Sequence, residues 1–176
     1  MKKNVTLKLL TLTVIMAFLL LEQNSFAQGS KVNFSGTWAF NESKSDVGGG
    51  GSRGFRMGPS QMTVTQEGMN LTIARVRTNR DGEQTTTTDK YTMDGKEIVN
   101  ESSSGRGGPT KTTVSWSADG KTLNFAVTRT FEREGQTMEM KSSEAWTLTD
   151  ARTLSVVSTF NTPDGEMKTT LVYDKK

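Results

Sequence analysis

The side chains of this 176-residue chain offer few routes to catalysis, because it contains neither His nor Cys. Their absence excludes Ser-His triads, thiol nucleophiles, the common zinc sites and haem held by His. Carboxylate pairs such as Glu132 with Glu134 remain, but charged residues at alternating strand positions are usually solvated. We therefore expect a protein that is not an enzyme and that uses no cofactor and no metal.

Two charged residues occupy positions where an apolar side chain is expected. Arg129 continues the alternation of Phe125, and Glu144 lies two residues before Trp146. If the alternation holds, both charges face the interior, where an unpaired charge is costly. A two-residue turn between their strands would place Arg129 opposite Met140 and Glu144 opposite Phe125. Both side chains are either polar anchors for a ligand in a hydrated lumen or, where a bulge reverses the alternation, exposed to solvent.

Turn signals recur along the chain every 12 to 16 residues. Glycine after an acidic residue favours a tight hairpin, because glycine accepts a positive φ. Two further turns are expected at 104–109 and 149–153. The six acidic-glycine pairs are Glu67-Gly68, Asp81-Gly82, Asp94-Gly95, Asp119-Gly120, Glu134-Gly135 and Asp164-Gly165.

The segments between these turns are rich in Thr, Val, Ile, Leu and aromatic residues that alternate with period two, which predicts strands. We expect an all-β protein, an antiparallel up-and-down meander closed into a small barrel of eight to ten strands, because closure removes exposed edges. Ten strands are predicted, at 34–41, 61–67, 70–79, 84–93, 97–102, 110–117, 121–133, 136–148, 152–161 and 166–174.

Residues 1–27 have the pattern of a cleaved signal peptide. Three lysines precede an apolar run of 13 residues, too short to span a bilayer, and Ser25-Phe26-Ala27 supplies small residues for cleavage. The mature chain would then be a single domain, 28–176, with 19 basic and 18 acidic residues once three Lys and one Glu are removed. We expect an exported bacterial protein, periplasmic or extracellular, since eukaryotic secreted domains usually contain disulfides.

The segment 46–60 interrupts the strand pattern. It is rich in glycine and lacks the Gly-Lys-Ser/Thr ending of a phosphate-binding loop. Its composition is typical of a flexible surface loop, while Arg53, Phe55 and Arg56 are candidates for contact with a ligand or partner.

The first predicted strand resembles that of the fatty-acid-binding protein and lipocalin group (the calycins). The likeness lies in Phe34, Gly36, Thr37, Trp38 and Phe40. It implies a barrel whose narrow end is plugged by Gly36 and Trp38, with a late basic residue, Lys175 or Lys176, packed on the indole.

Two features depart from the fatty-acid-binding branch. That branch has a helical lid after the first strand, where this chain has the glycine-rich segment. It also usually has an arginine two residues before the C-terminal tyrosine, and here that position is Leu171, before Tyr173.

The expected function is therefore non-enzymatic binding of a small apolar or amphipathic ligand in the barrel. The alternative is a filled-core module that contacts another envelope or extracellular component through its loops. We expect a monomer that binds no nucleic acid, because the mature charge is nearly balanced. An integral membrane barrel is not expected, because Lys111 and Lys141 would face lipid. The predicted ligand-binding residues are Trp116, Phe125, Arg129, Glu144, Trp146 and Tyr173.

Overall fold

The computed structural model describes residues 31–47, 58–79, 81–100, 108–133, 135–162 and 165–176. All of them belong to one unit, Lys31–Lys176. The predicted signal peptide, 1–27, lies outside the described residues, and so do residues 48–57 of the glycine-rich segment.

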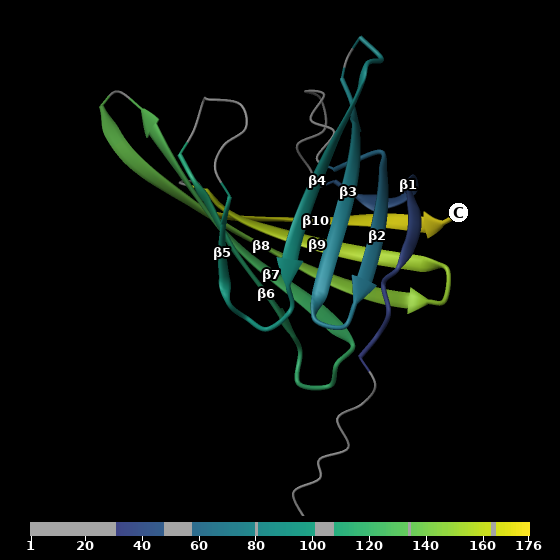
Figure 1. The fold of residues 1–176 in the computed structure, drawn as a ribbon. Coiled ribbons are helices and arrows are strands. Elements are labelled where there is room, and N and C mark those ends of the chain that lie inside the picture. Colours follow the sequence, from purple (N-terminus) through teal and green to yellow (C-terminus); the bar gives the residue numbers. More distant parts are fainter. Residues whose placement is uncertain (1–30, 48–57, 80, 101–107, 134, 163–164) are drawn as a thin grey trace, which may run out of the picture. The chain divides into compact units, whose positions relative to one another are not determined.

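Ten antiparallel strands form a single sheet (Figure 1). Each strand pairs with the next one in sequence, except that the fourth and fifth strands do not pair. The predicted all-β meander is confirmed, as is the barrel architecture that the calycin resemblance implies. The strands are β1 Gly36–Asp46, β2 Gln61–Glu67, β3 Asn70–Thr78, β4 Gln84–Thr92, β5 Glu97–Asn100, β6 Thr110–Trp116, β7 Thr122–Arg133, β8 Gln136–Asp150, β9 Thr153–Thr162 and β10 Gly165–Lys175.

The first strand joins the two halves of the sheet. β1 pairs with β10 on one side and with β2 on the other, so that Trp38 is opposite both Lys175 and Met62. A bulge interrupts the β1–β10 register between Asn41 and Asp46. β1 thus extends five residues past the predicted strand end at 41, because the bulge lets it rejoin β10.

The sheet is open between β4 and β5, which form its two ends. The turn at Asp94-Gly95 joins these strands, but its backbone bonds elsewhere: the Met93 N–H donates to the Met69 carbonyl at 2.8 Å, and the Gly95 N–H to the Val114 carbonyl at 3.0 Å. Within this short link, the backbone bonds first to the β2–β3 turn and then to β6. The predicted barrel is therefore nearly closed, with its opening between β4 and β5.

One end of the interior is filled by aromatic side chains. Phe34 and Trp38 are fully buried, and the Trp38 Nε1 donates to the Phe34 carbonyl at 2.9 Å. The Phe34 ring stacks on Trp116 and meets Trp146 edge-on, with centroids 5.9 and 6.3 Å away. Gln66 holds this segment in place, since its Oε1 accepts from the Phe34 N–H at 3.1 Å. We call this region the filled end.

The C-terminal strand covers Trp38. The Lys175 Nζ lies 5.2 Å from the centroid of the indole, a cation–π distance and one of the two contacts expected from the resemblance. Gly36 leaves room for the lysine: a Cβ there, where φ is 145°, would lie 2.6 Å from Lys175 Cε. Lys176 instead donates to Gln61 Oε1.

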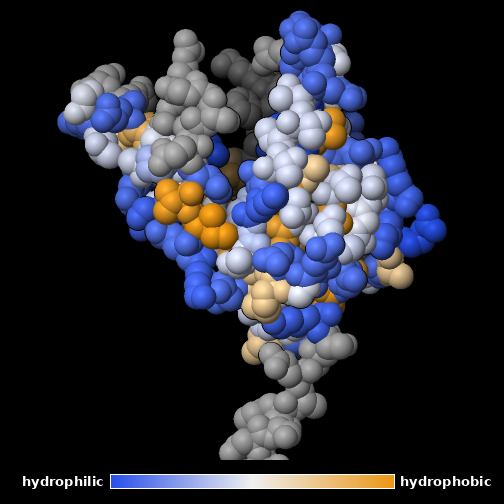
Figure 2. All heavy atoms as spheres, in the orientation of Figure 1, coloured by the Kyte–Doolittle hydropathy of each residue, from blue (hydrophilic) through white to orange (hydrophobic). Residues whose placement is uncertain are grey.

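The side of the molecule shown in Figure 2 is mostly polar. Hydrophilic and near-neutral side chains dominate the view in Figure 2, and a group of hydrophobic side chains lies at the position of β5. Val99 of this strand is 52% exposed.

Replacing Trp38 should destabilise the fold strongly. Trp38→Ala removes a fully buried indole, and we expect a loss of about 3–5 kcal/mol in the free energy of unfolding. The matched variant Lys175→Met removes only the cation above the ring and should cost about 0.5–1 kcal/mol. Urea denaturation followed by tryptophan fluorescence measures both. Equal, small effects would contradict a structural plug.

Candidate functional site

Most of the aromatic residues assigned to ligand binding belong to a packed interior. Phe125, Trp146 and Tyr173 are buried, and the rings of Phe125 and Trp146 have centroids 5.0 Å apart. Tyr173 meets Phe40 at 5.7 Å. Across the open edge, Tyr91 of β4 reaches Phe125 of β7, also at 5.7 Å. The contact of Tyr91 with Phe125 therefore links β4 and β7, two strands that do not pair with each other.

Glu144 faces the interior. The β7–β8 register has no shift over its whole length, so the alternation that buries Trp146 also turns Glu144 inward. The Trp146 Nε1 donates to Glu144 Oε2 at 3.0 Å. Glu144 also interacts electrostatically with Arg75, Tyr91 and Tyr173, from three other strands. Of the two alternatives open for Glu144, the inward one is found.

Arg75 supplies a positive charge that sequence reasoning missed. Its Nη1 lies 2.6 Å from Asp89 Oδ2, and the two side chains are 13% and 34% exposed. Arg75 continues the alternation of the core residues Leu71 and Ile73 on β3. That alternation is the signal that could have found it, by the same reasoning that picked out Glu144.

The electrostatic environment holds this cluster in defined protonation states. Burial lowers the pKa of Arg75, but Tyr91, Glu144 and Asp89 outweigh it and leave the pKa above its ordinary value. Burial raises the pKa of Tyr91, and burial together with Glu144 raises that of Tyr173. The guanidinium is therefore charged and both phenols are neutral at physiological pH.

A row of polar side chains crosses β8, β9 and β10 at the level of Glu144. Ser158 is opposite Glu144, and Thr169 is opposite Ser158. Ser158 and Thr169 are 5% and 2% exposed, and no described residue forms a hydrogen bond with the Thr169 Oγ1. Each of these three polar residues lies two positions from a core residue on its own strand, and these core residues are Trp146, Val156 and Leu171. We call Glu144, Ser158 and Thr169 the polar row.

Beyond the polar row, the same side of the sheet presents exposed methionines. Met138, Met140 and Met167 are 42%, 39% and 41% exposed. Phe131 is opposite Met138, and Phe160 is opposite Met167, both partly buried. Strand alternation places all five on the side that the polar row occupies. We call these five residues the methionine surface.

Arg129 lies at the rim of this surface. It is opposite Met140, as the predicted two-residue turn requires, and opposite Thr110 at the start of β6. It keeps the core-facing alternation, yet its side chain is exposed, because the β7–β8 hairpin continues past the β9 pairing, which begins at Ser142. Of the two open alternatives, Arg129 meets solvent, but without a bulge.

Trp116 lies at the filled end rather than beside the polar row. It is partly buried against Phe34, and the Lys31 Nζ lies 5.7 Å from its ring centroid. Its Nε1 donates no hydrogen bond to any residue within the described ranges. Its contacts give it a packing role.

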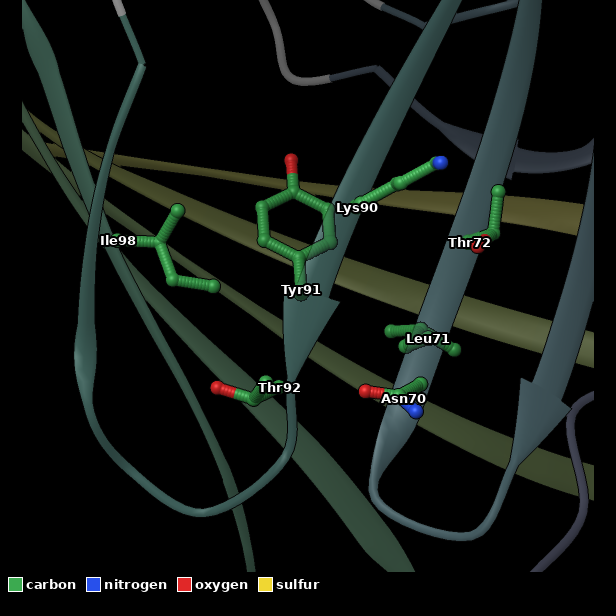
Figure 3. A pocket seen from close by; sticks show the side chains of 7 residues that line it. All are labelled: Asn70, Leu71, Thr72, Lys90, Tyr91, Thr92 and Ile98. Carbon is green, nitrogen blue, oxygen red and sulfur yellow. The ribbon is translucent and has the colours of Figure 1, made fainter.

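A hollow of about 320 Å³ lies at the open edge of the sheet. Figure 3 shows Ile98 extending from β5 toward Tyr91 of β4. Because Tyr91 also contacts Phe125, its ring stands between this hollow and the aromatic interior. The lining residues are Asn70, Leu71, Thr72, Lys90, Tyr91, Thr92 and Ile98.

Within the described ranges, no group of three or more acidic residues is placed to hold a metal ion. The same part of the chain has no helix with the length and apolar character needed to cross a membrane.

Comparison with known proteins shows a likeness to solved structures. No protein-family model matches the chain, and no curated protein matches it. Among solved structures, it is similar to the zebrafish ileal bile acid-binding protein complexed with cholic acid, at 16% identity and a TM-score of 0.49, over 81% of this chain and 98% of that one. At this score the likeness supports no inference about function.

Removing the Arg75 charge should destabilise the interior. Arg75→Met leaves Asp89 without its partner, and we expect a loss of about 1–3 kcal/mol in the free energy of unfolding. Arg77→Met, an exposed position two residues along β3, should change it by less than about 0.5 kcal/mol. Urea denaturation of both variants tests this, and equal losses would show that Arg75 is an ordinary surface charge.

Proposed function

We propose that this protein binds a small amphipathic ligand on the core-facing side of its sheet, between the polar row and the methionine surface. The observation that supports this most is the adjacency of the two sets. Phe160 pairs with Met167 while Ser158, two residues along β9, pairs with Thr169. A polar group and an apolar body in one molecule would match these two neighbouring surfaces.

The polar row has unused hydrogen-bonding capacity. Buried hydroxyl groups nearly always have a partner, and one left without costs about 1–3 kcal/mol. In the described part of the chain, the Thr169 Oγ1 lacks such a partner. A ligand group that bonds to Thr169 would recover this energy, which gives polar recognition a physical basis.

The methionine surface suits an apolar body of no fixed shape. Methionine is unbranched and its thioether is polarizable, so it adapts to irregular partners. Covering apolar area stabilises a complex by about 25 cal/mol per Å² removed from water. Three methionines, each about two-fifths exposed, therefore offer area that a ligand can bury.

The filled end sets the depth of this site. Phe34 and Trp38 are fully buried at that end, and the packed rings of Phe125 and Trp146 form a floor next to Glu144. In this proposal Glu144 is a polar anchor, whereas Trp116 takes no part in binding. The role is binding without catalysis.

A second candidate is the filled-core module that contacts an envelope or extracellular component. The packing of the filled end and the exposure of Val99 on β5 support it. Under this proposal the interior takes no ligand.

We also propose that the protein is exported from a bacterial cell after cleavage of residues 1–27. The lysines, the apolar run and the small residues before Gln28 support this.

The export proposal predicts the mature N-terminus. Expression of the full chain in a bacterium, followed by cell fractionation and N-terminal sequencing, should give a periplasmic or secreted protein beginning at Gln28. An Ala27→Leu variant should block or shift the cleavage, because the site requires a small residue there. Retention of residues 1–27 in a cytoplasmic product would contradict the proposal.

Ligand binding should depend on the methionine surface. Titration with Nile red, a neutral apolar dye, should give saturable fluorescence, and Met140→Gln should weaken the dye about threefold to tenfold by removing apolar contact area. Met69→Gln is the matched control, since Met69 is 43% exposed but lies in the β2–β3 turn.

Both variants should unfold at the wild-type midpoint, because both side chains are exposed. Native mass spectrometry of the purified protein should then identify a small molecule bound at one to one. An absence of saturable Nile red binding would contradict the binding proposal and favour the interaction module. Equal weakening by Met69→Gln would place the dye elsewhere.

A further inference from the structure

We infer that the polar group of the ligand is a hydrogen-bond donor, an amine or a hydroxyl, and that the site rejects a carboxylate. The inference rests on the proposed function and concerns the chemistry of the polar row. The observation behind it is that Glu144 faces the interior as an acceptor while the nearby arginine is already paired.

Glu144 has acceptor capacity to spare. An ionised carboxylate only accepts hydrogen bonds and has about four lone-pair sites on two oxygens. Oε2 accepts one bond from the Trp146 Nε1, and no other described residue donates a hydrogen bond to the carboxylate of Glu144. A donor on the ligand would therefore find an acceptor at this position.

The hydroxyls of the polar row complement this acceptor. Ser158 and Thr169 are each able to accept a bond and donate one, and the Thr169 Oγ1 has no partner among the residues that the structure describes. Glu144, Ser158 and Thr169 lie opposite one another across three strands, so one small head group can reach more than one of them. An alcohol or an ammonium group satisfies this arrangement.

The positive charge near the row is not available to an anion. Arg75 lies 2.6 Å from Asp89, and Tyr91 is also beside it. Because Asp89 already balances the charge of Arg75, a ligand carboxylate would gain little from Arg75 and would be repelled by Glu144. Like charges placed close together in a partly buried site are unfavourable.

The remaining charged groups do not reverse this balance. Arg77 on β3 and Arg129 on β7 share the core-facing alternation, but both side chains are exposed and therefore well solvated. Exposed charges act weakly because water and salt screen them. The partly buried groups, Glu144 and Asp89 against Arg75, sum to one negative charge.

A head-group series tests the inference. Dodecylamine, dodecan-1-ol and dodecanoate share one alkyl chain. Each should be titrated against the protein–Nile red complex at pH 7, the alcohol below its solubility limit and the other two below their critical micelle concentrations. We expect the amine and the alcohol to displace the dye at concentrations at least about tenfold lower than dodecanoate, because repulsion by Glu144 acts only on the anion.

Two variants connect this preference to the polar row. Glu144→Gln should weaken the binding of dodecylamine about tenfold, because it removes the negative charge. The difference in affinity between dodecylamine and dodecanoate should therefore become smaller. Thr169→Val should weaken dodecan-1-ol while leaving Nile red unchanged. Glu139→Gln, an exposed position on the opposite side of β8, is the matched control and should alter none of the three.

The outcomes separate the two proposals. This inference would be overturned if dodecanoate displaced the dye at the same concentration as the amine, or if all three competitors displaced it equally. Either result would leave the binding function intact. Failure of Nile red to bind would overturn the binding function and this inference together. Loss of the amine preference in Glu144→Gln, with the wild-type unfolding midpoint retained, would support the inference.

Discussion

The pairing of β1 with both β2 and β10 is the constraint on which the rest of this structure depends. It joins the N-terminal half of the meander to the C-terminal half and brings Trp38 opposite Lys175 and Met62. Because alternation has a period of two, a slip of one residue at this junction would turn the inner face of β10 outward. The buried indole and the close approach of Gly36 to Lys175 oppose such a slip.

A fixed alternation explains how charges come to lie inside the barrel. Once Trp146 is in the core, Glu144 must face the same side, and once Ile73 is in the core, Arg75 must do so too. Burying one such charge alone would be costly, whereas opposite charges from different strands offset part of the penalty. The pairing of Arg75 with Asp89 and the bond from Trp146 to Glu144 are the local solutions.

The sequence predicted the elements well because their signals are local. Acidic-glycine turns located most of the links between strands, although the one at Asp94-Gly95 joins strands that do not pair. The turn length predicted the registers of Arg129 with Met140 and Glu144 with Phe125, which the structure confirms. The opening between β4 and β5 was not predicted, since it depends on which distant carbonyls Met93 and Gly95 reach. Arg75 and the exposure of Arg129 depend on which strands face one another and where pairing ends, and a single sequence does not encode these in any short window.

The interior changes in character along the strands, and this separates stability from recognition. The filled end contains the fully buried rings of Phe34 and Trp38, whose loss would cost most of a typical domain's margin. The polar row comes next, and the methionine surface lies beyond it, where β7 and β8 extend past β9. Because the rings already secure the fold, the outer part of the same sheet tolerates an unpartnered hydroxyl and exposed methionines. Those departures from ideal packing are what a binding site requires.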